Sequence, residues 1–145
     1  MKRTRHYAAA SGVVAVIAGL AISACGGTAA PATGSAQAAQ AVTVEVPHAD
    51  RFAPFLTSVT SGSTVTFHNG DSDKHSVISV PGDSLNLNHT LQPGETWTVT
   101  LSIPGSHEYF CSFHAAYDTA TGQVRALPTA DHPDEPMQGL LEVSP

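Results

Sequence analysis

The chain has 145 residues, of which 41% are hydrophobic and 12% charged, and its formal net charge at pH 7 is −6. Twelve acidic residues against six basic ones exclude the broad basic surface that nucleic-acid binding requires. Three of the basic residues, Lys2, Arg3 and Arg5, stand at the N-terminus, so the chain beyond residue 25 has a net charge of −9. We therefore expect either cationic partners or a charge that serves solubility alone.

The first 24 residues have the pattern of a signal peptide, with a basic start followed by an apolar segment from Ala8 to Ala24. Small residues lead directly into Cys25, which resembles a bacterial lipobox. We therefore predict a lipoprotein signal peptide over residues 1–24 and lipidation of Cys25. An uncleaved membrane anchor or an ordinary signal peptide with a chance cysteine are the alternatives. Acyl chains on Cys25 would hold an extracytoplasmic protein on the membrane surface, facing the periplasm in a cell with two membranes.

Residues 26–40 contain only Gly, Thr, Ala, Pro, Ser and Gln. Such a segment buries too little apolar surface to offset its ordering entropy, so residues 25–40 are predicted to form a flexible, lipid-anchored linker. The remaining residues, 41–145, suffice for one domain, which we expect to be monomeric.

Short β-branched segments separated by turn residues predict that this domain is all-β. The clearest strand patterns cover residues 42–46, 62–67, 75–80, 96–101, 107–111 and 140–143. Val65 and Phe67 are expected to share one face, and Trp97, Val99 and Leu101 are expected to point inward. About seven to eight strands with regularly spaced turns predict a two-sheet antiparallel Greek-key sandwich.

Four residues from separate segments have side chains that bind metals: His75, Cys111, His114 and Met137. Two imidazoles, a thiolate and a thioether form the ligand set of a type 1, or blue, copper site. Sulfur ligands favour Cu(I), while imidazole also suits Cu(II), so one site can serve both oxidation states. Metal binding also explains Cys111 itself, because an unpaired thiol in an exported protein is a liability unless a metal protects it.

The residues around this set resemble the plastocyanin/azurin-like cupredoxins. The matching segments are Phe52-Ala-Pro54, Val59, Gly62 to Phe67, Asn69, Asp71, His75, Pro104-Gly105, Tyr109-Phe-Cys111, His114, Met137-Gln-Gly139 and Val143. The resemblance covers residues 42–143 and implies one copper ion per domain, held by the four residues named above. It also implies that the Ser76 N–H donates a hydrogen bond to the thiolate. Many relatives have Asn at this position, so a bridge between the ligand loops through an amide side chain is lost, and Asn69 could brace the loop instead.

The larger departure from the family is an insertion over residues 115–136. In short-loop members the methionine follows soon after the second histidine, where this chain has Thr119, but Met137 comes 23 residues after His114. Met137 is still the predicted axial ligand, because it leads into the last strand as the family's methionine does. The alternative is that Met137 is a buried core residue. The axial ligand would then be His132 or a backbone carbonyl, or the site would have no fourth ligand.

The insertion carries Asp118, Asp131, Asp134 and Glu135 against Arg125 alone, and its Gly and Pro residues argue against one long helix. One interpretation is an acidic flap that selects a basic redox partner by electrostatic steering. The other is a solvated loop that merely shields the metal. Among the remaining histidines, His107 deserves a check, because it lies four residues before Cys111 and faces the same side of a regular strand.

Three functions compete for these features. The first is an electron carrier that shuttles single electrons between redox partner proteins at the outer side of the cytoplasmic membrane, and the second is a copper-binding or delivery module without a redox partner. The third is an enzyme with Cys111 as nucleophile and His114 as base, but no orienting acid is evident and His75 and Met137 would have no role. Nitrite reductases and multicopper oxidases need further domains and ligand sets. We therefore expect a carrier and no enzymatic activity, and nothing in the sequence requires a structural zinc site.

Overall fold

A computed structural model describes residues 37–128, 130 and 134–145. The described residues all lie within one compact unit, residues 35–145. The predicted signal peptide, Cys25 and His132 lie outside the described residues. No helix in the described part of the chain has the length and apolar character needed to cross a membrane.

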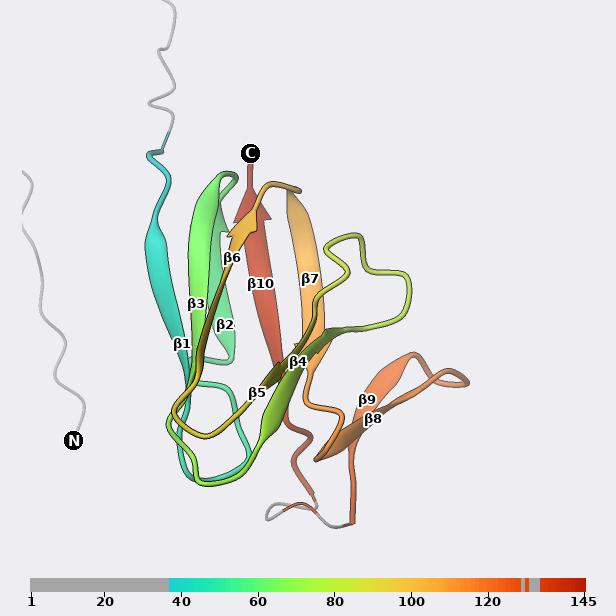
Figure 1. Cartoon of the computed structure of the whole chain (residues 1–145). Coiled ribbons are helices and arrows are strands. Elements are labelled where there is room, and N and C mark those ends of the chain that lie inside the picture. The colour runs from blue at the N-terminus through green and yellow to red at the C-terminus, as the bar shows by residue number, and fades with distance from the viewer. Residues whose placement is uncertain (1–36, 129, 131–133) are drawn as a thin grey trace, which may run out of the picture. The chain divides into compact units, whose positions relative to one another are not determined.

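The described residues form ten strands in three sheets (Figure 1). The strands are β1 (Ala41–Val46), β2 (Leu56–Thr60), β3 (Ser63–Asn69), β4 (His75–Ser79), β5 (Asn88–Leu91), β6 (Thr96–Leu101), β7 (Gly105–Phe110), β8 (Ala115–Asp118), β9 (Gln123–Ala126) and β10 (Gln138–Ser144). One sheet has the order β1-β3-β6, the second has the order β2-β10-β7-β4-β5, and β8 and β9 form a separate hairpin. The predicted all-β sandwich is confirmed, with more strands than expected.

The two main sheets are mixed and not purely antiparallel as predicted. β1 pairs with β3 in parallel, β2 pairs with β10 in parallel, and the other pairs within the two sheets are antiparallel. The parallel pairing of β1 and β3 follows from the path of the chain, because β2 lies between them in sequence but belongs to the opposite sheet. Strand alternation predicts which residues are buried, but it does not predict which strands become neighbours.

The core lies between the two main sheets and contains the residues that alternation selects. Val65 and Phe67 are fully buried on β3, as predicted, and so is Leu101 on β6. Across the sheets, the Phe67 ring meets the Tyr109 ring edge-on, with 5.3 Å between centroids. Trp97 is only partly buried, but it pairs with Phe67 across β3 and β6 and so lies on the inward face, as predicted, with the two rings stacked at 5.7 Å between centroids.

Four strands were not predicted: β2, β5, β8 and β9. None of them has a sustained alternation of apolar residues. β5 contributes only Leu91 to the core. β8 and β9 pair only with each other, and their Ala115 and Val124 pack with Phe110 of β7 in a small second cluster. Residues 115–126 of the insertion therefore fold as a hairpin, and the described part of the insertion contains no long helix, in agreement with the prediction. Its turn needs Gly122 at a φ of +70°, and the Asp118 carboxylate accepts a hydrogen bond from the Ala120 N–H at 2.9 Å.

Strands β7 and β10 approach each other closely because one residue between them has no side chain. Gly139 on β10 pairs with Tyr109 on β7, and a Cβ at position 139 would overlap the hydroxyl end of the Tyr109 ring. One residue beyond this ladder, the Cys111 N–H donates to the Met137 carbonyl at 3.0 Å. The ladder therefore fixes Cys111 beside Met137.

Candidate metal centre

The candidate ligands meet where strands of the larger sheet begin and end. His75 is the first residue of β4, and Cys111 directly follows the last residue of β7, which runs antiparallel to β4. After Cys111 the chain turns tightly, with the N–H groups of His114 and Ala115 both donating to the Cys111 carbonyl. This turn places the His114 side chain back over Cys111.

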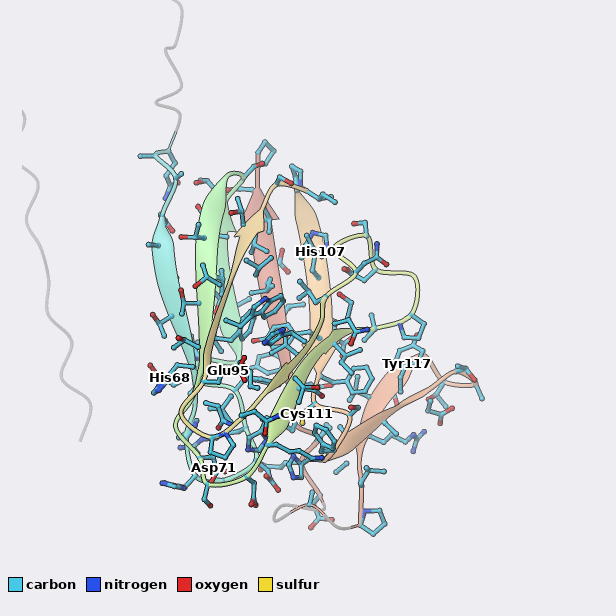
Figure 2. All side chains as sticks on the ribbon, viewed as in Figure 1. His68, Asp71, Glu95, His107, Cys111 and Tyr117 are labelled. Carbon is cyan, nitrogen blue, oxygen red and sulfur yellow. The ribbon has the colours of Figure 1, made fainter. Side chains whose placement is uncertain are left out.

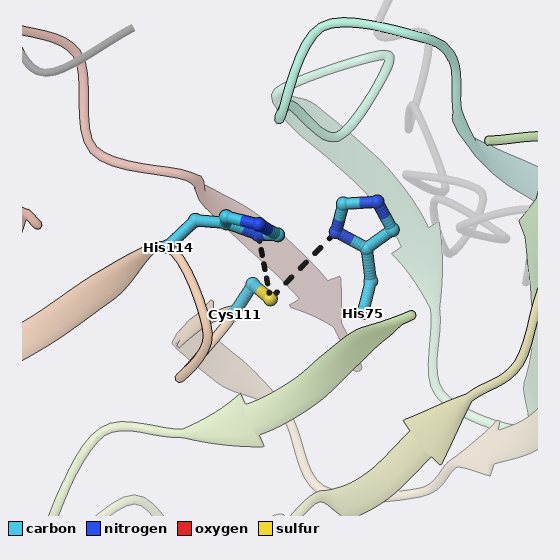
Figure 3. Close-up of side chains that lie close together, drawn as sticks. All are labelled: His75, Cys111 and His114. Carbon is cyan, nitrogen blue, oxygen red and sulfur yellow. Dashed lines mark hydrogen bonds between the residues drawn. The ribbon is translucent and has the colours of Figure 1, made fainter. Parts of the chain in front are cut away.

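The three side chains form one compact group (Figure 3). The Cys111 Sγ lies 3.8 Å from the Nδ1 of His75 and 3.5 Å from the Nδ1 of His114. Cys111 and His75 are fully buried, whereas the His114 side chain keeps 14% of its surface exposed. Both Nδ1 atoms thus face the sulfur, and one edge of the group remains open to solvent.

Met137, the predicted axial ligand, is buried to 1% exposure in the same apolar cluster as Cys111. Its backbone is hydrogen-bonded to Cys111, as described above. Thr119, which occupies the place of the methionine in short-loop relatives, is instead exposed in the turn between β8 and β9. The fold therefore brings the neighbourhood of Met137 to the candidate centre and leaves Thr119 on the surface.

Ser76 connects the two ligand loops in a way that the sequence did not indicate. Its N–H donates to Cys111 Sγ at 3.3 Å, as the resemblance implies. Its hydroxyl accepts a hydrogen bond from the Ser112 N–H at 2.9 Å and lies 3.1 Å from the Ser112 hydroxyl. The expectation that replacing Asn by Ser removes the side-chain bridge was therefore incomplete, because the hydroxyl forms a shorter bridge of its own.

Asn69 organises the loop that leads to His75. Its side-chain amide donates to the carbonyls of Asp73 and Leu91, at 2.8 and 3.2 Å, and its side-chain oxygen accepts from the Asp71 N–H at 3.0 Å. Asn69 is fully buried, so these bonds are shielded from water. They tie the loop to the end of β5 and fix the start of β4.

Burial sets the protonation of the unloaded centre. It raises the pKa of the Cys111 thiol, against the opposing effect of N–H donors from Ser76, Phe113 and His114. It lowers the pKa of His75, although the carboxylate of Asp71 acts in the other direction. At neutral pH the centre therefore contains a thiol and a neutral His75 imidazole, and a metal ion must displace the thiol proton.

We predict that copper loading releases this proton. At about pH 8, Cu(II) binding should release about one proton, and the affinity should rise about tenfold per pH unit below the pKa of Cys111, since only the thiolate is a ligand. Isothermal titration in buffers of different ionisation enthalpy measures the proton count. Cys111→Ser is the control, because its hydroxyl keeps its proton. A copper affinity that stays constant as the pH rises would contradict the assignment of the thiolate.

We predict that Ser76→Ala destabilises the metal-free protein by about 1 kcal/mol, because the hydrogen bond from the Ser112 N–H to the hydroxyl of the buried Ser76 is lost. Urea unfolding monitored by Trp97 fluorescence measures this change. Ser106→Ala is a matched control, since it removes an exposed serine hydroxyl bonded to Glu142 and should change stability by less than about 0.5 kcal/mol. Equal effects of the two variants would mean that the bridge does not support the loops.

His107 does not join the candidate centre. It is 4% exposed, and its ring nitrogens lie 2.8 Å from an Asp83 carboxylate oxygen and 2.9 Å from the Ile103 carbonyl. Figure 2 shows His107 far along β7 from Cys111. A regular strand puts both side chains on the same side, but four residues of extended chain separate them too widely to share an ion.

Two carboxylates that the sequence did not single out as site residues face the outer nitrogens of the candidate ligands. The His75 Nε2–H donates to Asp71 Oδ2 at 3.3 Å, and His114 Nε2 lies 3.3 Å from Asp50 Oδ1. Asp71 was part of the family pattern without an assigned role, and no motif marks Asp50. The sequence spacing between these carboxylates and the ligands does not predict the contacts, because the contact between Asp50 and His114 depends on the packing of separate loops.

Comparison with known proteins places this fold and site in a family. The sequence pattern of the cupredoxin-like domain matches residues 12–124, which include His75, Cys111 and His114 and end before Met137. The chain belongs to the cupredoxin-like family.

Relatives of this cupredoxin include plastocyanins. It is 36% identical over 73 residues to the chloroplastic plastocyanin of Hordeum vulgare, a match that covers 44% of this chain and 47% of that protein. It is 34% identical over 92 residues to the plastocyanin of Prochlorothrix hollandica, covering 55% of this chain and 70% of the relative. The chain thus spans about half the length of the barley protein and more of the other.

Solved structures share the fold of this cupredoxin. A reduced amicyanin variant superposes with a TM-score of 0.52 at 20% identity, over 71% of this chain and 81% of the amicyanin. A copper-containing nitrite reductase from Thermus scotoductus superposes with a TM-score of 0.51 at 21% identity, but the match covers only 22% of that longer protein. At these identities the likeness concerns the fold alone.

The donor set fits a copper ion. A thiolate and two imidazoles in one buried group are the ligands that type 1 copper takes, with a weak axial thioether as the usual fourth. Cys111 is a free cysteine, so its sulfur is available to a metal. His75, Cys111 and His114 would hold the ion, and Met137 would complete the set.

Proposed function

We propose that this protein is a type 1 copper protein that carries single electrons between redox partner proteins. The observation that carries the proposal is the convergence of Cys111 Sγ and the Nδ1 atoms of His75 and His114 within one buried group. The bound copper ion would supply the one-electron chemistry, cycling between Cu(II) and Cu(I). The fold would supply a ligand set that changes little between the two states.

The surroundings of the ligands support such a low-rearrangement site. His75 is fixed at the start of β4, and Cys111 is fixed by its N–H bond to the Met137 carbonyl. The Ser76–Ser112 bridge then ties the two ligand loops to each other. Ligands that are held by strands and hydrogen bonds move little when the charge of the metal changes, which favours fast electron exchange.

The partially exposed edge of His114 is the proposed route for electrons, because the other three proposed ligands are buried. A partner with a basic docking surface would be attracted by the exposed Asp134 and Glu135 that precede Met137. Arg125 pairs with Asp118 at 2.9 Å, so the Asp118 carboxylate adds little to the attraction of a basic partner. Lys74 lies over the Phe113 ring beside the ligand loop, and its positive charge also reduces the attraction of a basic partner.

The salt dependence of electron exchange separates steering from simple shielding by the insertion. We expect exchange with a cationic partner to slow as ionic strength rises, and exchange with an anionic partner to accelerate. Equal insensitivity of both reactions would leave the insertion as a shield.

The sequence-based location belongs to the same proposal. Lipidation of Cys25 would anchor the domain outside the cytoplasmic membrane by a flexible linker, where it could reach membrane-bound partners. Metabolic labelling with a fatty-acid analogue tests this, with Cys25→Ser as the unlabelled control.

A copper-binding or delivery module is the second candidate, because it would use the same ligands. Optical spectroscopy and voltammetry of the copper-loaded protein distinguish the two. An electron carrier should absorb intensely near the red end of the visible spectrum and show a reversible one-electron potential. A colourless protein that holds only Cu(I) would support delivery instead.

We predict that Met137→Leu keeps the intense colour but raises the reduction potential. Leucine has nearly the same volume, so the core should tolerate it. Loss of the axial thioether lowers the number of ligands, which disfavours Cu(II) more than Cu(I). Voltammetry and the visible spectrum measure the two effects, and Thr119→Ala is the control at the short-loop position. An unchanged potential would make Met137 a core residue without a ligand role.

A further inference from the structure

The outer sides of both candidate histidine ligands are occupied by carboxylates from two separate loops. We propose that Asp71 and Asp50 are positioning residues, which hold the imidazoles of His75 and His114 through their Nε2 sides and favour the oxidised state of the metal. This inference rests on the proposed copper site and goes beyond it, because it assigns the setting of the potential to residues outside the ligand set. Figure 2 shows Asp71 at the same end of the domain as Cys111.

Asp71 is held in place from several directions. Its side chain is 10% exposed, and its Oδ1 accepts the Ser72 N–H at 2.6 Å and lies 2.9 Å from His48 Nδ1. Its own N–H is bound by the Asn69 side chain. These contacts leave Oδ2 directed at His75 Nε2. The carboxylate is therefore a fixed acceptor and not a surface charge that happens to lie nearby.

The charge of Asp71 fixes the tautomer of His75. A carboxylate only accepts hydrogen bonds, so the neutral His75 ring must carry its proton on Nε2. The lone pair of Nδ1 is then directed towards Cys111, as a metal ligand requires.

Asp50 reaches His114 at the expense of backbone strain. Ala49 has a φ of 140° and Asp50 has a φ of 42°, so two consecutive residues with side chains adopt left-handed conformations. Residues with side chains rarely adopt such conformations, and strain of this kind concentrates at functional sites. The conformation is secured by the paired backbone bonds between Glu45 and Ala53, both 2.8 Å long. The result is a carboxylate whose side chain is only 6% exposed, 3.3 Å from His114 Nε2.

Both carboxylates should lower the reduction potential. The hydrogen bond from His75 Nε2 to Asp71 makes that imidazole a stronger donor, and this favours Cu(II) over Cu(I). The added negative charge acts in the same direction, because the oxidised ion carries the larger positive charge. The Ser76 N–H acts in the opposite direction, since a hydrogen bond to the sulfur weakens the thiolate as a donor. The potential would therefore reflect a balance between these two effects.

The test uses Asp71→Asn and Asp50→Asn, which keep the side-chain shape and remove the charge. Glu45→Gln is the matched control, since Glu45 also pairs with a histidine, His68 at 2.6 Å, which is no candidate ligand. Each Asn variant should bind Cu(II) about 10–100-fold more weakly, with a smaller loss for Cu(I). For each tenfold by which the loss of Cu(II) affinity exceeds the loss of Cu(I) affinity, the reduction potential rises by about 59 mV. The control should stay close to the wild-type protein.

A second readout needs no copper. Nitrogen-15 NMR of the metal-free protein should show the proton on Nε2 of His75 and His114 in the wild type, and a mixture of tautomers for the ring next to each Asn substitution. If Asp50→Asn fails to fold, Asp71→Asn alone decides, because Asp71 does not belong to the strained turn.

The outcomes separate this inference from the proposed function. Potentials and tautomers in both Asn variants that shift no more than in Glu45→Gln would overturn the positioning role while leaving the copper site intact. A wild-type protein that forms no blue copper site would overturn the proposed function. In that case the tautomers of the metal-free protein would still test whether the carboxylates position the rings.

Discussion

Cys111→Ser is expected to abolish the intense visible absorption of the copper-loaded protein and to weaken copper binding by more than about 100-fold. Loss of a residue that only orients a ligand costs about 10–100-fold in metal affinity, and loss of the strongest ligand should cost more. Serine is close in size to cysteine, but its hydroxyl stays protonated and gives no thiolate-to-copper absorption. Competition titration against a chelator and the visible spectrum measure the two effects.

The chain offers a matched control for this substitution, because its only other cysteine is Cys25. Cys25→Ser should leave the colour and the copper affinity of the domain unchanged, whatever it does to membrane attachment. Circular dichroism of both metal-free variants checks that the fold is intact. A blue colour that persists in Cys111→Ser would refute the site assignment altogether.

Gly139→Ala is expected to destabilise the metal-free protein by about 3 kcal/mol and to disturb the copper site as well. The added methyl group would collide with the Tyr109 ring, coming within 2.9 Å of its Cε1 and closer to its hydroxyl end. The ring has little room to move, because it packs against Phe52 and Phe67 with centroid separations of 4.8 and 5.3 Å. Overpacking of this kind typically costs about 1–3 kcal/mol. Urea unfolding measures the loss.

The effect should extend to the metal, since Gly139 and Tyr109 belong to the ladder that sets Met137 beside Cys111. A broadened or shifted visible spectrum in the copper-loaded variant would report this displacement. Gly70→Ala is the control, because a Cβ there makes only ordinary contacts, with Val46 O at 3.4 Å as the nearest atom, and it should change stability by less than about 0.5 kcal/mol. Equal stability of the two variants would mean that β7 and β10 tolerate a wider separation.

The strands that were predicted are those whose pattern of buried residues follows from neighbouring residues in the sequence. Alternating residues predicted β3 and β6, because the side chains that alternate in the sequence also alternate between core and solvent. β5 escaped prediction because it buries a single apolar residue, Leu91, fully. The parallel pairing of β1 with β3 escaped because it depends on which sheet β2 joins.

The candidate site divides in the same way. The residue types and the flanking segments of His75, Cys111, His114 and Met137 were sufficient to predict these four residues as metal ligands. Met137 follows the long insertion, and the structure places its backbone in contact with Cys111. The bridge from Ser76 to Ser112 had no signal, because its atoms come from positions 36 residues apart.

The sequence by itself determined the ligand chemistry and the all-β character of the domain, since both are properties of residue types and of their local order. Only the tertiary structure decided how the strands pair, how the ligand loops are tied together, and that Asp71 and Asp50 face the outer nitrogens of the two histidines. These features depend on contacts between distant segments, and such contacts form only when the two sheets pack against each other. The local order of residues therefore does not determine which distant loops come into contact.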